Sequence, residues 1–566
     1  MNVRQILAAL ILLSAASAGS AAPTDAAASN LRIAVVQMFV RPALAENQDR
    51  IVAGIALAAG QRARVAVFPE GALSGSGEDR PEAVEEALGA IRRAASQRGI
   101  YVVMGAHTFL DSLKKAGNWM LVVGPDGREV FRYEKLYENH RAKMPGVFQI
   151  DGVPCGSMIC ADRWLRGVVE IPIQEGAQIG FELSNNFACE WVPEYGRYWN
   201  VPLAMRNAVW SVLANSANSA VAAEKSKHGH SAVIAPDGRI VAAASGDTEE
   251  LIVADVEPAQ ATRAEALARA AHPALRAFWD AGIKLQQGQS IESPSFKAIK
   301  SAQAEITLAA AGVVDDLPRM EGLIREAHAK KADLIAFPAQ AIAEEALEKL
   351  QAAARSNRII VVFGAEHREA AGLRNSAFVI GPDGTVLTRY DQLSSSKPFQ
   401  PGTNAAAMWF RVNGAAAFVT IGRDGLWSEL SELSAVAGAR VHIHLDCDSD
   451  SSPTARQRRL QVWANAASFR TFTATANVDE AMIWDDLHGD EESRAVVKGT
   501  PRPDPGEVAV YSPFSANLVA RASPGGLVVV TRRVPAVNPY HPAKTSSLNP
   551  QMKAWYELGA QSISPR

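Results

Sequence analysis

The amino-acid sequence predicts an α/β protein built from two tandem domains of the same fold. The chain has 566 residues, more than one hydrophobic core ordinarily holds, because domains typically contain about 100 to 200 residues. In each half, short apolar runs alternate with amphipathic stretches, the pattern of buried strands separated by helices. The second half also repeats the first at a separation of about 260 residues, far longer than the units of solenoid repeats.

The repeat is visible in matched segments along the chain. The pairs are 98–106 with 357–365, 124–127 with 381–384, 158–177 with 420–439, and 273–282 with 550–559. Because even the two tails agree, the repeat spans whole domains. We therefore expect a first domain over residues 31–285, a linker over residues 286–302 and a second domain over residues 303–566.

The elements of the first domain follow from the spacing of apolar residues and from turn residues. Pro69 predicts the end of the strand before it, because proline cannot donate to a sheet. The turn at 124–127, Gly-Pro-Asp-Gly, lies between two apolar runs and predicts a β-hairpin, so the sheets should be mixed rather than purely parallel. In chain order we expect a strand at 33–36, a helix at 47–59, a strand at 65–68, a helix at 81–97, strands at 101–104, 121–123 and 129–131, and a helix with a connector over 258–300.

The first residues have the composition of a secretory signal peptide. Arg4 precedes an apolar run at residues 6–13, and small residues follow up to Ala22, where cleavage is expected. The alternative is an uncleaved membrane anchor, although a bilayer-spanning helix needs about 20 apolar residues, and no later segment reaches that length either. We therefore expect residues 1–22 to be a signal peptide, and the mature protein to be exported to the periplasm without a stable membrane span.

The composition argues against some partners. Hydrophobic residues make up 48% and charged residues 21% of the chain, which is ordinary for a globular protein. The net charge of -3 provides no basic field for nucleic acid. The cysteines are Cys155, Cys160, Cys189 and Cys447; Cys155 and Cys160 would lie on opposite faces of one strand, so we expect no disulfide framework. We expect no nucleic-acid partner and at least one cysteine kept free for another purpose.

Three residues stand where a strand or hairpin is predicted to end. Cys160 ends an apolar stretch, Glu70 follows Pro69, and Lys135 comes just after the hairpin. A cysteine is a nucleophile as its thiolate, and a carboxylate within hydrogen-bonding reach can take the proton. Judged singly, each residue has an ordinary alternative role. Cys160 would be a small core residue, Glu70 a solvated or helix-capping carboxylate, and Lys135 a surface charge.

Taken together, the contexts of these residues resemble a known family. Phe68-Pro69-Glu70, Lys135-Leu136 and Ile159-Cys160-Ala161-Asp162 are similar, in order and spacing, to the three signature regions of the nitrilase, or carbon–nitrogen hydrolase, superfamily. The resemblance covers about residues 31–281 and, more weakly, the second half. It implies two α-β-β-α sandwich domains, paired within the chain, and a Glu70–Lys135–Cys160 triad that needs no cofactor and no metal. Glu138 resembles a second glutamate that many members place beside the triad, with a surface carboxylate as the alternative.

The resemblance also implies a reaction. Cys160 would attack the substrate, Glu70 would act as general base, and Lys135 would stabilise the oxyanion, with a thioester as intermediate. We expect hydrolysis of an amide or N-carbamoyl substrate. Nitrile hydrolysis is the runner-up, and a non-catalytic binding or scaffold protein with a relic triad is the alternative from another class.

Residues near the triad are candidates for binding the substrate. Arg163 would pair with a substrate carboxylate, because a guanidinium suits bidentate recognition, or instead with Asp162 or Glu170. If Glu182 is buried, its negative charge would favour a substrate that carries a cationic amine. The other candidates for substrate binding are Trp164, with a core position as its alternative, and Asn185.

The second half has lost all three residues of the triad. Carrying the repeat through, Glu70 corresponds to Ala339, Lys135 to Gln392 and Cys160 to Gly422. Alanine cannot take a proton, glutamine carries no charge and glycine offers no nucleophile. We therefore expect an inactive second domain that pairs with the first, either as a purely structural partner or with a binding role of its own, and a higher oligomer is not excluded.

Overall fold

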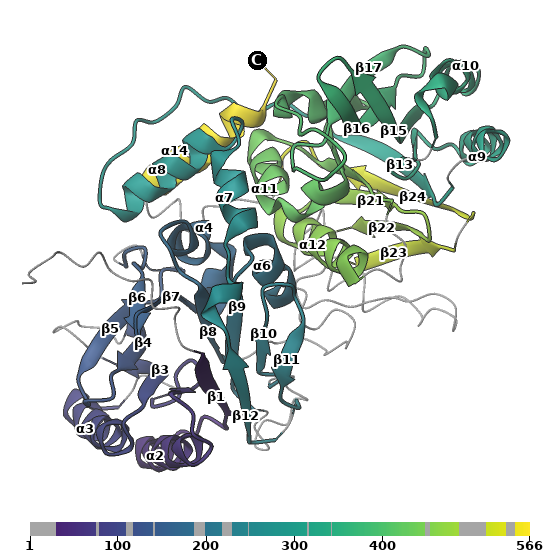
Figure 1. Cartoon of the computed structure of the whole chain (residues 1–566). Coiled ribbons are helices and arrows are strands. Elements are labelled where there is room, and N and C mark those ends of the chain that lie inside the picture. The colour runs from purple at the N-terminus through teal and green to yellow at the C-terminus, as the bar shows by residue number, and fades with distance from the viewer. Residues whose placement is uncertain are drawn as a thin grey trace, which may run out of the picture.

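The computed structural model describes most of the two repeated halves. The described residues are 30–74, 79–108, 117–137, 139, 142–185, 199–217, 229–246, 248–313, 316–340, 342–447, 453–485, 517–523, 525–538 and 550–565. The predicted signal peptide, Glu138 and Cys189 lie outside these residues. The described part of the chain forms a mixed α/β fold with four six-stranded sheets, two in each half (Figure 1).

In the first domain, two sheets lie face to face around a shared apolar core. The first sheet has the order β12-β1-β2-β3-β4-β5, and its strands are β1 (Leu31–Gln37), β2 (Val65–Val67), β3 (Tyr101–Thr108), β4 (Gly117–Val123), β5 (Glu129–Glu134) and β12 (Glu250–Val256). The second has the order β11-β10-β9-β8-β7-β6, and its strands are β6 (Phe148–Ile150), β7 (Val153–Ile159), β8 (Ile179–Ser184), β9 (Trp210–Asn215), β10 (Ala232–Ile234) and β11 (Ile240–Ala243).

The middle strands of both sheets run parallel, and the outer strands run antiparallel to them. β1, β2 and β3 are parallel in the first sheet, as are β7, β8 and β9 in the second. β4 and β5 form the predicted antiparallel hairpin. The sheets are therefore mixed, as the Gly-Pro-Asp-Gly turn predicts, and the carboxyl ends of the parallel strands present a set of loops from which a site can be built.

Helices cover the outer faces of both sheets. The amphipathic helices α2 (Leu44–Gly60) and α3 (Pro81–Arg98) bury their apolar sides on the first sheet. On the second sheet, the covering elements are η1 (Cys160–Trp164), α4 (Arg166–Val169), α5 (Ile171–Gln174) and α6 (Asn200–Asn207). The elements that follow β12 are η2 (Pro258–Gln260) and α7 (Ala264–Ala271), and α7 packs against α5 and α6. The first domain is thus an α-β-β-α sandwich.

The second domain repeats this architecture. Its first sheet contains β13 (Ala304–Ala311), β14 (Leu334–Ala336), β15 (Ile360–Glu369), β16 (Gly372–Ile380), β17 (Val386–Asp391) and β24 (Leu527–Val534). Its second sheet contains β18 (Trp409–Val412), β19 (Ala415–Ile421), β20 (Val441–Leu445), β21 (Phe472–Ala476), β22 (Ala481–Asp485) and β23 (Asn517–Ala522). The helical elements are α9 (Leu317–Ala329), η3 (Glu344–Ala346), α10 (Leu347–Asn357), η4 (Ala405–Met408), η5 (Gly422–Leu426), α11 (Ser428–Ala437) and α12 (Pro453–Phe469).

The two repeated tails lie side by side at the seam between the domains (Figure 1). They are α8 (Arg276–Gln286), which follows the first domain, and α14 (Pro550–Ile563), which ends the second. The ring of Phe278 stacks on Trp555 with centroids 4.8 Å apart, and both belong to a core cluster shared by the domains. The repeat therefore forms a pseudo-dimer within one chain.

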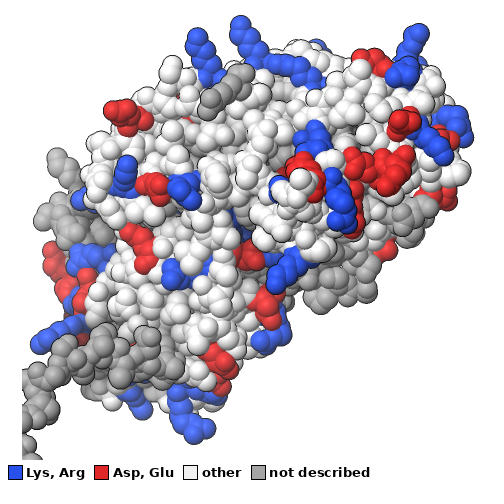
Figure 2. All heavy atoms as spheres, turned by 45° about the horizontal axis from the view of Figure 1, so that its top comes forward, with Lys and Arg blue, Asp and Glu red and all other residues white. Residues whose placement is uncertain are grey.

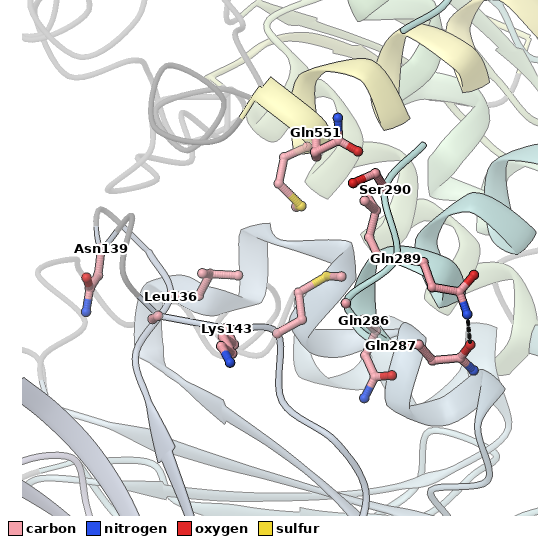
Figure 3. Close-up of a pocket in the computed structure, with 13 residues that line it drawn as sticks. Leu136, Asn139, Lys143, Gln286, Gln287, Gln289, Ser290 and Gln551 are labelled. Atoms are coloured by element: carbon pink, nitrogen blue, oxygen red, sulfur yellow. Dashed lines mark hydrogen bonds between the residues drawn. The ribbon is translucent and has the colours of Figure 1, made fainter. Parts of the chain in front are cut away.

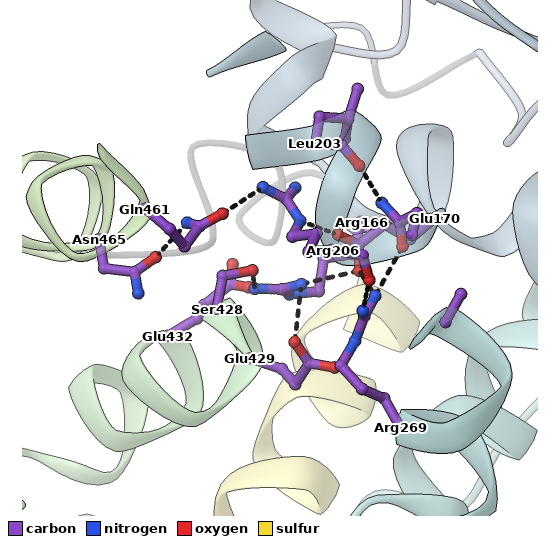
Figure 4. A network of polar contacts seen from close by, with 12 residues as sticks. Arg166, Glu170, Leu203, Arg206, Arg269, Ser428, Glu429, Glu432, Gln461 and Asn465 are labelled. Carbon is purple, nitrogen blue, oxygen red and sulfur yellow. Dashed lines mark hydrogen bonds and ion pairs between the residues drawn. The ribbon is translucent and has the colours of Figure 1, made fainter. Parts of the chain in front are cut away.

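A buried polar network crosses the same seam (Figure 4). Arg166 pairs with Glu170 of its own domain and with Glu432 of the other. Arg269 Nε lies 2.7 Å from Glu429 Oε1 across the seam. Burial alone would raise the pKa of Glu170, but the nearby arginines outweigh burial and lower it to about 2. These charges are therefore compensated by one another rather than by solvent.

Charged side chains of both signs are mixed on the face of the molecule shown in Figure 2. Basic and acidic side chains are interspersed there among uncharged residues. In the part of the chain that the structure describes, none of the helices combines the length and the apolar character needed to cross a membrane.

Candidate active site

Three predicted residues come together where strands of the first domain end. Glu70 is the third residue after β2, Lys135 follows β5 directly, and Cys160 follows β7 directly. β2 and β7 belong to the two different sheets, so the stacking of the sheets brings these loops to one place. Carboxyl ends of parallel strands are where α/β folds commonly build their sites.

Glu70 is held in a fixed position by donors from three directions. Its Oε1 accepts hydrogen bonds from Lys135 Nζ at 2.7 Å and from Asn118 Nδ2 at 2.6 Å. Its Oε2 accepts from the backbone N–H of Asn185 at 3.0 Å. The side chain is only 6% exposed. A carboxylate with these partners is oriented before any substrate arrives.

Lys135 is charged in this environment. Burial alone would lower its pKa, but the charge of Glu70, the hydrogen bond to it and the electrostatic interaction with the ionised form of Cys160 outweigh burial and raise the pKa above the ordinary value. Its backbone N–H donates to the carbonyl of Asn118 at 2.8 Å, which extends the hairpin pairing to the residue that carries the ammonium. A fixed cation is therefore available beside the carboxylate.

Cys160 begins the turn η1 with an unusual backbone conformation. Its φ is 48°, in the left-handed region that a residue with a Cβ adopts at a cost of about 1 kcal/mol or more. Burial and the charge of Glu70 raise the pKa of its thiol to about 11, against the opposite effect of Arg163 and Lys135. The resting side chain is therefore a protonated thiol, which can act as a nucleophile only if a base takes its proton.

Asp162 fixes the loop that carries Lys135. This fully buried carboxylate accepts from the Tyr133 hydroxyl at 2.9 Å and from the backbone N–H groups of Leu136 and Tyr137 at 3.1 and 2.8 Å. Burial raises the pKa of Asp162 to about 7, even though Lys135 and these hydrogen bonds act to lower it. The turn after Cys160 is thereby tied to the loop after β5.

Comparison with known proteins identifies the family. The sequence profile described as carbon-nitrogen hydrolase matches residues 32–266 and again residues 301–487. The chain belongs to the carbon-nitrogen hydrolase family. Both halves match, so the family architecture is present twice, as the repeat predicts.

Individual relatives are distant in sequence. The omega-amidase NIT2 of Danio rerio is 28% identical over 255 residues, which are 40% of this chain and 89% of that protein. The glutamine-dependent NAD(+) synthetase of Xylella fastidiosa is 29% identical over 250 residues, 40% of this chain and 44% of that protein. A solved mutant of the Nesterenkonia AN1 amidase from the nitrilase superfamily is 22% identical, with a TM-score of 0.37 over 41% of this chain and 93% of that one.

Arg163 and Glu182 of this carbon-nitrogen hydrolase bind each other. An Nη2–Oε1 ion pair joins them, and their side chains are 3% and 0% exposed. Arg163 Nη2 also donates to Ser184 Oγ at 3.0 Å, and Asn200 Nδ2 donates to Glu182 at 2.6 Å. The Arg163 partner is thus Glu182 rather than Asp162 or Glu170, and contact with a substrate stays a prediction for both residues.

The remaining predicted residues have different places. Trp164 lies 4.9 Å from the ring of Trp199, centroid to centroid, and packs against an apolar cluster that includes Trp463 of the second domain. Asn185 contacts Glu70 through its backbone, and its side chain accepts from Ser216 at 2.7 Å. Glu138 lies outside the described residues. For Trp164, Asn185 and Glu138, substrate contact or a place beside the triad stays a prediction.

The second domain keeps the frame of the site without its reactive groups. Tyr390 donates to Asp424 at 2.6 Å, as Tyr133 does to Asp162. Gly422 has a φ of 57°, close to that of Cys160. A Cβ added at Gly422 would lie 2.3 Å from Gln392 Oε1, so the Gln392 side chain, at the counterpart of Lys135, occupies the space that corresponds to the Cys160 side chain.

Sequence reasoning missed Asn118, Tyr133 and Asp162 as parts of the site. Each has the same residue at its counterpart in the second half, at Asn375, Tyr390 and Asp424. That retention through a repeat that lost its triad was the signal available in the sequence. It indicates a role in holding the loops rather than in the reaction itself.

A hollow of about 410 Å³ lies on the seam beside the loop that follows Lys135 (Figure 3). Its walls come from that loop, from the connector after α8 and from the start of α14. Lining residues that Figure 3 labels include Leu136, Asn139, Lys143, Gln286 and Gln551. The triad side chains do not line it, so it is a separate feature of the domain junction.

Proposed function

We propose that the first domain hydrolyses an amide or N-carbamoyl bond through a thioester on Cys160. The observation that carries the proposal is the direct contact of Lys135 Nζ with Glu70 Oε1 at 2.7 Å, next to a cysteine whose electrostatics both residues affect. An amide is preferred to a nitrile because relatives of the chain are named omega-amidases.

The first half-reaction forms the thioester. Glu70 takes the proton of the Cys160 thiol as Sγ bonds to the substrate carbon. The oxyanion that develops is stabilised by the Lys135 ammonium. The tetrahedral intermediate then collapses: its C–N bond breaks, and Glu70 gives its proton to the departing amine or ammonia. The raised pKa of the thiol makes this base necessary, because little thiolate exists in advance.

The second half-reaction releases the acid. Glu70 takes a proton from water as its oxygen attacks the thioester carbon. The C–S bond then breaks, and the proton returns from Glu70 to the sulfur. The carboxylate and the thiol are thus restored without any further reactant.

In this proposal the second domain is catalytically inactive. Ala339, Gln392 and Gly422 stand in place of the triad. Gln392 is buried; it accepts a hydrogen bond from Asn375 and donates to the Ser394 carbonyl and to the Ser396 hydroxyl. A glutamine held in this way leaves little room for a substrate at the old nucleophile position. The second domain then acts as the structural partner of the first.

We also propose that the protein works outside the cytoplasm. The support is the composition of residues 1–22, with Arg4 before an apolar run and small residues up to Ala22. Cleavage can be checked by the N-terminal mass of the protein recovered from a periplasmic fraction. A protein that keeps residues 1–22 and stays with the membrane would favour the anchor instead.

Ammonia release tests the proposed reaction. The full mature chain is incubated with primary amides, amides of dicarboxylic acids, N-carbamoyl amino acids and nitriles, and the responding class names the substrate type. Cys160→Ala should abolish release and should prevent the acyl adduct seen by intact mass. Cys155→Ala is the matched control, because this buried cysteine lies on β7 with its pKa raised by burial, and it should keep activity. Equal release from wild type and Cys160→Ala would refute the thioester mechanism.

A further inference from the structure

Arg163 and Glu182 of the first domain form a buried ion pair that the proposed reaction does not use. Arg163 is in η1, and Glu182 is in β8, the next strand of the sheet. Glu182 accepts hydrogen bonds from Arg163, Ser184 and Asn200. Burying such a pair is costly unless its geometry is well satisfied, so its presence calls for a physical reason.

Arg163 contacts the nucleophile's own backbone. Its Nε donates to the carbonyl oxygen of Cys160 at 3.0 Å, while the other end of the guanidinium binds Glu182. The carbonyl belongs to the residue with a φ of 48°. A guanidinium fork is planar and rigid, so anchoring one end on β8 fixes the direction of that carbonyl, and with it the left-handed conformation that sets where Sγ points.

The second domain shows that the fold does not need this pair. η5 and β20 repeat η1 and β8, but Arg163 corresponds to Gly425, Glu182 to His444 and Asn200 to Val462. A Cβ at Gly425 would lie 2.6 Å from His444 and 3.1 Å from Val462. The imidazole and the valine therefore fill the space near the missing guanidinium, and the same turn forms without an ion pair.

Comparing the Arg163–Glu182 pair with Asp162 distinguishes a contact that the fold retains in both domains from one that occurs only beside the cysteine. The clamp of Tyr133 and Asp162 is retained in the second domain as Tyr390 and Asp424, although no triad remains there. Arg163 and Glu182 are absent where the nucleophile is absent, and the turn there carries Gly422, which has no Cβ to strain. The pair therefore follows the cysteine rather than the fold.

We propose that Arg163 and Glu182 are a positioning pair for Cys160, and that they are not ligands of the substrate. The proposal rests on Cys160 being the nucleophile, as proposed above. The guanidinium holds the Cys160 carbonyl, and the Glu182 carboxylate holds the guanidinium. The two opposite charges also balance each other close to the thiol.

The charges around the thiol make the proposal testable by pH. The charged groups with the largest effects on Cys160 are Glu70 after β2, Lys135 after β5, Arg163 in η1 and Glu182 in β8. Arg163 lowers the pKa of the thiol and Glu182 raises it. Removing one charge of the pair should therefore move the thiol's titration in one direction, and removing the other should move it in the opposite direction.

The first experiment measures the alkylation rate of Cys160 by iodoacetamide against pH, with the modified peptide read by mass spectrometry. Arg163→Met should move the profile to higher pH, and Glu182→Gln should move it to lower pH. Each shift of one pKa unit changes the rate at neutral pH by about tenfold. Arg263→Met is the matched control, because its guanidinium binds the carbonyl of Ile173 rather than that of Cys160, and its profile should match wild type.

A second set of variants separates position from charge. Arg163→Lys keeps the charge but loses the fork, so it should keep the pH profile while lowering kcat. The triple variant Arg163→Gly, Glu182→His, Asn200→Val copies the second domain; it should melt near the wild-type temperature and change the alkylation midpoint little, because both charges are lost together, and yet lower kcat by about tenfold or more through misplacement of the thiol.

The competing roles give different results. A substrate-binding Arg163 would raise KM in Arg163→Lys with kcat unchanged, and that result would overturn the proposal. Wild-type kcat in the triple variant would also overturn it, since the pair would then be dispensable. Alkylation requires no substrate, so a failure to find hydrolysis would refute the proposed function without being mistaken for a failure of the positioning pair.

Discussion

Cys160 and Gly422 occupy the same left-handed turn, with φ values of 48° and 57°, and what each carries decides what its domain can do. In the first domain the turn presents a thiol to Glu70 and Lys135. In the second, the Gln392 side chain has moved into the space that a Cβ would take. The absence of a thiol at this turn and the occupation of its space by Gln392 thus go together in the second domain.

The carboxylate of Glu70 opposes ionisation of the Cys160 thiol, because both groups would carry negative charge. Together with burial, it raises the pKa of the thiol to about 11. Replacing Glu70 by Gln removes the negative charge and keeps the shape. We therefore expect Glu70→Gln to move the pH midpoint of Cys160 alkylation to a lower value while it abolishes ammonia release, because the base is gone.

Alkylation and ammonia release are measured on the same preparation, so the opposite directions of the two effects are informative. Glu175→Gln is a suitable control, since this carboxyl is exposed and is not among the groups with the largest effects on Cys160. An upward shift of the midpoint in Glu70→Gln would contradict the electrostatic argument. Retained hydrolysis would contradict the role of Glu70 as base.

At the scale of elements, the sequence predicted most of the frame that holds the site. The helix predicted at 47–59 lies within α2, and the helix predicted at 81–97 lies within α3. Pro69 ends β2 where expected, and the Gly-Pro-Asp-Gly turn joins β4 to β5. These features follow from local spacing, turn chemistry and the repeat, all of which can be read along the chain.

The partners across the structure could not be predicted in the same way. The pairing of Arg163 with Glu182 depends on β7 and β8 lying next to each other in a fixed register. The contact of Asn118 with Glu70 depends on how β4 and the end of β2 are arranged within one sheet. Side-chain contacts between segments far apart in the sequence are set by tertiary packing, which residue patterns in a single sequence do not specify.

The packing of α8 on α14 leaves no room for a side chain at the crossing. A Cβ at Gly559 would lie 2.5 Å from Phe278 and 2.7 Å from Leu433. We expect Gly559→Ala to lower the free energy of unfolding by about 1–3 kcal/mol, the range for overpacked cores, because the helices must move apart. Thermal unfolding of the full chain measures this effect.

A glycine in another helix provides the control for this substitution. Gly322 lies in α9, where an added Cβ would meet only Arg325 at 3.8 Å. Gly322→Ala should leave stability unchanged or raise it by up to about 1 kcal/mol, since alanine favours helix. Equal effects at both positions would mean that close packing of α8 on α14 is not what Gly559 provides.

At the scale of the whole molecule, the two domains meet around a pseudo-twofold axis with charges divided between them. Glu170 and Glu432 are repeat counterparts, and so are Arg166 and Ser428. Arg166 Nη2 donates to Ser428 Oγ at 2.9 Å, so a residue contacts its own counterpart, as happens near a twofold axis.

This division of charge favours pairing between the two different domains over pairing between two copies of the same domain. In the network of Figure 4 the first domain contributes Arg166, Arg206 and Arg269 with Glu170, whereas the second contributes Glu429 and Glu432. Two copies of the first domain paired in this way would bring Arg166 against itself. The interface is therefore complementary between the repeats and not within either one.

Such a network should join the domains into one unfolding unit. Arg269 and Glu429 are both fully buried and pair at 2.7 Å across the seam. Removing one member of a buried pair leaves an uncompensated charge at a cost of about 3–5 kcal/mol. Arg269→Met and Glu429→Gln should therefore each destabilise the chain strongly, and the double variant should lose less than the two single losses added together.

Calorimetry of the four chains tests this expectation. Wild type should give one unfolding transition, because its domains share a core cluster as well as the ion pairs. Each single variant should lower the transition temperature or split the transition into two, as the domains begin to unfold separately, and the double variant should recover part of the loss. Strictly additive losses would show that Arg269 and Glu429 do not couple, and two transitions in wild type would show that the seam does not bind the domains into one unit.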